Sequence, residues 1–129
     1  MKRAALTIAL SIGLLSGGRA YAHHAFAATY VPDKMASIDG ELLQFVYRNP
    51  HAIIQVAAPD ANHTMQKWTI EWEGRADLDH QGVTGRTLKA GDHVIITGNP
   101  GRNDTDHWLR ATAIVRPKDG WKWSVASVR

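Results

Sequence analysis

The fold is decided by one stretch, residues 37–57, which reads SIDGELLQFVYRNPHAIIQVA. It contains two β-rich segments separated by Asn49-Pro50-His51. Proline lacks an N–H and has a fixed φ, so it ends a strand rather than continuing through a central one. We therefore expect a long strand over 38–47 and a shorter strand over 51–57.

The apolar positions of the first segment change face partway along it. Ile38 and Leu42 share one parity, whereas Phe45 and Tyr47 share the other. A β-bulge or a glycine bend produces such a change, and Gly40 lies inside the segment. Because a bent strand can take part in two sheets of a closed barrel, the segment predicts a small curved barrel.

The rest of the chain adds three strands and one helix. Apolar and polar residues alternate from Lys67 to Glu73, which predicts a third, half-buried strand. Patterning and turn residues predict the other elements: a helix over 75–81, strands over 93–97 and 108–116, and a polar loop over 98–104. This is the element order of an OB-fold. We expect an all-β protein with one short helix, an OB-like five-stranded Greek-key barrel; a small β-sandwich is the alternative.

The first 22 residues have the features of a secretory signal peptide. Lys2 and Arg3 precede an apolar run over 4–15, and Ala20-Tyr21-Ala22 follows as a small-residue cleavage site. The apolar run is too short to cross a membrane. We expect cleavage after Ala22, a periplasmic or secreted protein, and no transmembrane segment in the mature chain.

Removal of this segment changes the charge of the protein. The whole chain has 15 Lys and Arg against 12 Asp and Glu, but three of the basic residues and none of the acidic ones precede residue 23. The mature chain is therefore balanced, and it lacks the basic surface expected of a nucleic-acid binder. With no cysteine, its stability depends on packing, and its five tryptophans are the expected anchors. We expect an N-terminal arm over 23–36, a barrel domain with a C-terminal tail over 37–129, and a monomer.

Four short motifs occur in one order along the mature chain. They are His23-His24-x-Phe26, Asn49-Pro50-His51, Gly91-Asp92-x-Val94 and Gly98-Asn99-Pro100-Gly101-Arg102. In this order they resemble a family of small secreted bacterial proteins classed as a domain of unknown function, with Ala25 in place of a serine. The resemblance covers the mature chain and implies no activity. It implies that the residues to inspect first are His23, His24, Phe26, Asn49, Pro50, His51 and Arg102.

The histidines at the expected mature start favour metal binding. A terminal His23 offers an α-amine and an imidazole nitrogen that chelate one ion, and copper favours such nitrogen-rich sets. Further imidazoles are available at His24, His51, His93 and His107. The alternative is that the first two histidines only begin a solvated arm, and that His51 only bonds a backbone carbonyl.

Acidic residues are weaker candidates. Glu71 and Glu73 lie on one strand face about 7 Å apart, as some glycosidase pairs do. They share that face with a lysine and a threonine, which indicates a solvated surface. Asp104, Asp106 and His107 crowd one loop without the spacing of a calcium-binding loop.

The tryptophans divide between core and surface. Trp68 and Trp72 have the parity of core residues, whereas Trp108 faces away from the core of its strand. Trp121 and Trp123, in the tail, either cap a barrel end or form a stacking platform for a ligand.

These observations favour a binding or accessory module over an enzyme. It would bind a metal ion, copper first, or a small ligand through the N-terminal histidines and His51, or dock on a protein partner. Two alternatives stay open: a copper-dependent oxidative enzyme that uses the N-terminal histidine, and a structural or protein-interaction module. A shared site requires the arm and the Asn-Pro-His turn to converge in space.

Overall fold

The computed structural model describes residues 24–125, so the expected signal peptide and His23 lie outside the described residues. The strands are β1 (Ala36–Val46), β2 (Ile53–Pro59), β3 (Met65–Glu71), β4 (His93–Pro100), β5 (Trp108–Arg116) and β6 (Trp121–Ser124). The helix α2 (Arg75–His80) lies between β3 and β4, and the 3-10 helix η1 (Asp104–Asp106) precedes β5. Residues 24–29 are also helical. No helix in the described part of the chain is long and apolar enough to cross a membrane.

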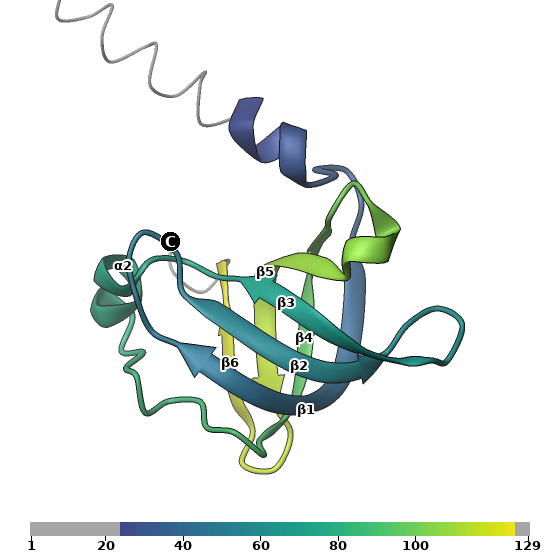
Figure 1. Ribbon diagram of the computed structural model, residues 1–129. Helices are drawn as coiled ribbons and strands as arrows, with labels where there is room; N and C mark the ends of the chain where they lie inside the picture. Colours follow the sequence, from purple (N-terminus) through teal and green to yellow (C-terminus); the bar gives the residue numbers. More distant parts are fainter. Residues whose placement is uncertain (1–23, 126–129) are drawn as a thin grey trace, which may run out of the picture.

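The strands close into a barrel (Figure 1). Hydrogen-bonded neighbours follow the order β3-β2-β1-β4-β5-β6, and a parallel pairing of β3 with β5 joins the two sides. Strands β1 to β5 thereby form a closed mixed barrel. β6 is an additional strand that pairs with β5. A five-stranded barrel with a helix between its third and fourth strands is an OB-like architecture. The predicted barrel is confirmed, and the sandwich alternative is wrong.

β1 bends at the position that the sequence indicates. Its first half pairs with β4 and its second half with β2, and the register shifts just after Leu42. Ile38 and Leu42 are buried before this bulge, and Phe45 packs against the core after it. A Cβ on Gly40 would overlap a backbone carbonyl of β2, so only glycine allows the two strands to approach here.

The two ends of the barrel differ. β1, β3 and β5 run in one direction and β2 and β4 in the other, so α2 lies at the end where β3 stops and β4 starts. Leu78 of α2 is fully buried in the core and helps to close this end. The opposite end, where β1 and β3 begin, carries loops instead; Figure 1 shows α2 and η1 on opposite sides of the barrel.

Two segments differ from the sequence expectation. The predicted loop over 98–104 starts later, because Gly98 and Asn99 continue β4. The Asn99 side chain is buried and donates to the carbonyls of Pro32 (3.0 Å) and Lys34 (2.9 Å), which ties β4 to the chain before β1. The predicted C-terminal tail contains a strand, β6, that pairs antiparallel with β5.

Candidate functional site

The N-terminal arm docks on the loop that follows β4. Residues 24–29 form a short helix, and Tyr30 pairs with Gly101 as an isolated β-bridge. The backbone N–H and the Nε of Arg102 donate to two carbonyls of the arm, at 3.0 and 2.5 Å. Phe26 packs on Tyr30 with ring centroids 5.4 Å apart. Arg102 thus holds the arm against the loop after β4, and Phe26 packs within the arm against Tyr30.

Side chains from three distant segments meet at the carboxylate of Glu71. The Tyr30 hydroxyl donates to Oε2 (2.5 Å), and His51 Nδ1 (2.5 Å) and Arg110 Nη1 (2.9 Å) lie against Oε1. Burial, and then the hydrogen bond to Glu71, raise the pKa of the Tyr30 phenol far above its ordinary value. The phenol therefore remains a donor to the carboxylate. The prediction of a solvated Glu71 is wrong: its side chain is 22% exposed, and both carboxylate oxygens contact other side chains.

The same carboxylate orients His51. Nδ1 lies against Glu71, the side chain is 47% exposed, and Nε2 makes no hydrogen bond to any residue that the structure describes. A carboxylate on one imidazole nitrogen fixes the ring and leaves the other nitrogen to act as a ligand or base. The arm reaches this pair through Tyr30, whereas His24 is exposed at the first described position of the arm. No group of three or more His, Cys, Asp or Glu within residues 24–125 has the arrangement of a metal site.

Asn49 and Pro50 connect this turn to α2. Gly74 precedes the helix and has no side chain to cap it, so Asn49 Oδ1 accepts the Ala76 N–H instead, at 3.0 Å. A Cβ on Gly74 would overlap the Pro50 carbonyl. These contacts give Asn49 and Pro50 structural roles, and they place the following residue, His51, beside β3.

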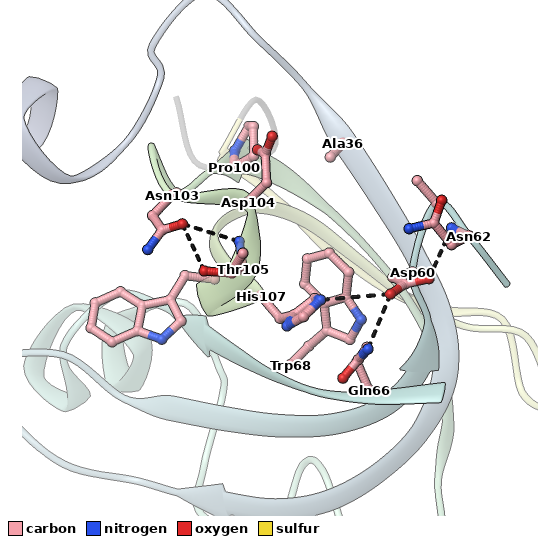
Figure 2. Close-up of a pocket in the computed structure, with 13 residues that line it drawn as sticks. Ala36, Asp60, Asn62, Gln66, Trp68, Pro100, Asn103, Asp104, Thr105 and His107 are labelled. Carbon is pink, nitrogen blue, oxygen red and sulfur yellow. Dashed lines mark hydrogen bonds and ion pairs between the residues drawn. The ribbon is translucent and has the colours of Figure 1, made fainter. Parts of the chain in front are cut away.

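A cavity of about 650 Å³ opens at the end of the barrel opposite α2 (Figure 2). Its lining comes from the start of β1, the loop after β2, the first half of β3 and the loop between β4 and β5. The side chains that give it its chemical character are those of Asp60, Gln66, Trp68, Asp104, His107 and Trp108. Mouths of β-barrels are common sites for small ligands.

The centre of the cavity holds an Asp–His pair beside an indole. Figure 2 shows the His107 imidazole directed at Asp60, with 3.8 Å between Nε2 and Oδ2. The imidazole packs edge-on against Trp68, with centroids 5.1 Å apart. The Thr64 N–H, and then the Gln66 side chain, hold the pKa of the Asp60 carboxyl below its usual value. Asp60 is therefore an anion at neutral pH.

Family comparison adds to this geometry. A sequence model of a family of unknown function, DUF6152, matches residues 13–110. The chain belongs to this family. The match contains the arm, the Asn-Pro-His turn and all four motifs, and it confirms the resemblance to a domain of unknown function. Because the function of DUF6152 is unknown, membership assigns no activity to the chain. No curated protein matches the chain.

In this DUF6152 chain, the three tryptophans of the last two strands differ in exposure. Trp108 is 43% exposed and lines the cavity. Trp121 is half-buried, with the Arg116 guanidinium 5.5 Å from its ring centroid. Trp123 is a core residue: it is 5% exposed and packs edge-on against Trp72. This burial excludes a stacking platform at Trp123.

The cavity has little signal in the sequence. Sequence patterns indicate His107 as a metal ligand and Trp108 as a surface aromatic, and they give Asp60 no role. The one local sign of the cavity is that Asp60 lies in a turn-rich segment directly after a strand. Nothing in the sequence relates that segment to the loop that carries His107.

Proposed function

We propose that this protein is a secreted small-ligand-binding module and that its site is the cavity at the open end of the barrel. The main support for this proposal is the size of the cavity, because its volume of about 650 Å³ lies in the range of small-molecule sites. Two indoles and several amide side chains line it, as is usual for such sites.

The character of the lining limits the class of ligand. Asp60 and Asp104 contribute negative charge, and no Lys or Arg occurs among the described residues that line the cavity. A polyanion such as a nucleic acid would be repelled. The ligand class is therefore a neutral or cationic small molecule.

The secreted location rests on residues 1–22, with their basic start, apolar run and small-residue cleavage site. Mass spectrometry of the protein recovered from the producing cells should find His23 as the first residue. A chain that keeps Met1 or Lys2 as its first residue would contradict secretion by this route.

The binding site can be tested by NMR of the tryptophan indole N–H groups. A panel of small polyols, sugars and amines is titrated into the protein, and at least one compound should shift the signals of Trp68 and Trp108 in a saturable way. Ala61→Phe places a large side chain at the cavity rim and should abolish the shifts. Ala90→Phe adds the same side chain at an exposed position outside the lining and should not.

Two results would contradict the site. In one, no compound of the panel shifts either indole signal. In the other, the shifts persist in Ala61→Phe, which would place the ligand elsewhere on the protein.

A second candidate function is copper binding at His51. The observation that favours it is the contact of His51 Nδ1 with Glu71, because metal-bound histidines commonly hold a carboxylate at their other nitrogen. Nε2 would then bind Cu(II) together with nitrogens of the N-terminal His23 and His24. The copper-dependent oxidative enzyme requires the same site.

Calorimetric titration of Cu(II) into the mature protein tests this candidate. Sub-micromolar binding should be lost in His51→Ala and in a form with one extra residue before His23. Weak binding that His51→Ala leaves unchanged would mean that the histidines bind copper only as an exposed terminus, and both copper hypotheses would fail.

A further inference from the structure

We infer that the cavity at the open end of the barrel binds an organic cation with an alkylated ammonium group, in preference to a sugar or other polyol. This inference rests on the proposed function of the cavity. Three observations support it: the charge of the lining, the internal hydrogen bonds already made by Asp60 and by several other lining groups, and the indoles.

The lining is negative, and neighbouring basic side chains do not neutralise it. Arg102 lies between two lining residues in the sequence, but its Nε donates to Ala27 of the arm. Lys67 also lies between two lining residues, but it is exposed and takes the opposite face of β3 from its neighbours. His107 lies 3.8 Å from Asp60 and makes no ion pair with Asp104 within the described residues, so the charge of Asp104 has no basic partner there.

The carboxylate of Asp60 already has its hydrogen-bond donors. Its Oδ1 accepts the backbone N–H groups of Asn62 (2.8 Å) and Thr64 (3.0 Å), and its Oδ2 accepts from Gln66 Nε2 (3.1 Å). Asp60 therefore offers a ligand negative charge more than a free acceptor. An alkylated ammonium group needs that charge and no hydrogen bond.

Two further side chains of the lining, Asn103 and Trp68, also have internal hydrogen-bond partners. Asn103 Oδ1 accepts from the N–H and hydroxyl of Thr105 (3.2 and 2.8 Å), and its Nδ2 donates to Asp106 (3.0 Å). Trp68 Nε1 donates to the Ala58 carbonyl (3.2 Å). A sugar depends on hydrogen bonds to free groups, and breaking these internal bonds to supply them would cost stability.

The aromatic groups and Asp104 complete the site. Trp108 is 43% exposed and Trp68 is half-buried, so indole surface is available to a cation, and an indole is the aromatic ring that attracts cations most strongly. The Asp104 carboxylate is exposed and makes no hydrogen bond within the described part of the chain, which leaves it free to pair with an ammonium group.

The test compares choline with 3,3-dimethylbutan-1-ol, an uncharged molecule of the same shape, and with methyl β-glucoside. All three are titrated into the mature protein at low salt, and the indole N–H signals of Trp68 and Trp108 report binding. Choline should bind at least about fivefold more tightly than its neutral analogue, since that is the size of one cation–indole or partly screened charge interaction. The glucoside should bind more weakly than choline.

Two variants test whether the carboxylate of Asp104 contributes to choline binding. Asp104→Asn should weaken choline binding about fivefold without changing the fold, because its carboxylate has no structural partner in the described residues. Glu41→Gln removes an exposed carboxylate of β1 outside the lining and should leave choline binding unchanged.

The outcomes separate this inference from the proposed function. Equal binding of choline and its neutral analogue, or tighter binding of the glucoside in the cavity, would overturn the cation preference and leave a ligand-binding cavity. An equal effect of Asp104→Asn and Glu41→Gln would also overturn it. Failure of every compound to shift either indole would overturn both.

Discussion

His51 Nδ1 lies 2.5 Å from Glu71 Oε1, and this contact joins the turn between β1 and β2 to the end of β3. The Tyr30 hydroxyl binds the other oxygen of the same carboxylate and adds the N-terminal arm. Arg110 adds β5. One partly buried carboxylate thus connects four segments that are remote in the sequence.

Replacement of Glu71 by glutamine should destabilise the protein by about 1–2 kcal/mol, because the amide loses the charge that Arg110 and His51 face and brings a donor toward Tyr30. Urea denaturation measures the change. Glu41→Gln is the matched control, since Glu41 is exposed and should change the free energy of unfolding by less than about 0.5 kcal/mol. Equal effects of the two substitutions would contradict the role of Glu71.

Tyr30→Phe should loosen the arm without unfolding the barrel. The variant loses the hydrogen bond to Glu71, worth about 1 kcal/mol, and keeps the ring that packs on Phe26. Hydrogen exchange should become faster at the Arg102 N–H, which donates to Thr29 of the arm. Tyr47→Phe is the control, because that hydroxyl binds Asp79 and the Val83 carbonyl on the α2 side of the barrel. Unchanged exchange at Arg102 in Tyr30→Phe would show that the hydroxyl does not hold the arm.

Asn49→Ala should destabilise the protein by about 1 kcal/mol through loss of the α2 cap. Asn49→Asp keeps an oxygen that accepts the Ala76 N–H and should retain most of the stability. Thermal or urea unfolding of the two variants measures the difference. Equal losses in both would mean that the contact between Asn49 and Ala76 contributes little.

Acid should destabilise the protein partly through Asp60 and Asp119. In the folded protein, the Thr64 N–H donates to Asp60 and the Arg116 guanidinium donates to Asp119. These hydrogen bonds lower the pKa of each carboxyl below its ordinary value of 3.8. Each carboxylate therefore stabilises the fold at pH values above 3.8, and this stability is lost as the pH falls through the lowered pKa.

Urea unfolding at a series of pH values measures this effect. Replacing both carboxyls, in an Asp60→Asn, Asp119→Asn variant, should make the free energy of unfolding less dependent on pH in this acidic range. A variant with the same pH dependence as the natural protein would show that other carboxyl groups account for the acid sensitivity.

The strands that the sequence predicts well are those with local signals. The sequence predicts the fifth over 108–116, the range of β5, because apolar and polar residues alternate from Leu109 to Ala113. Beyond Ala113 the buried face shifts to Ile114, beside an irregularity in the register with β4. The alternation predicts the third from Lys67 to Glu73, within two residues of β3 at each end. The sequence predicts only a tail where β6 lies, because four residues show too little alternation to define a strand. The pairing of β6 with β5 supplies its backbone hydrogen bonds.

The sequence predicts the candidate site less well than the strands, because the site depends on contacts between distant segments. The Asn-Pro-His motif indicates His51, but its partner Glu71 resembles any acidic residue on the polar face of a strand. Its burial depends on Tyr30 and Arg110, which reach it from outside its own strand. The sequence indicates His107 as a further imidazole for the N-terminal metal site or as part of its own acidic loop, whereas its actual partners are Asp60 and Trp68.

The sequence by itself determined strands β1 to β5 and favoured a barrel: strand alternation, the bend at Gly40 and the position of one helix are properties of neighbouring residues. The pairing of β3 with β5 then decided for the barrel and against the sandwich. The tertiary structure alone decided which polar groups meet. The cluster at Glu71 and the cavity at Trp68 are each built from segments that only barrel closure brings together, so their burial, charge and partners are properties of contacts and not of any single stretch of chain.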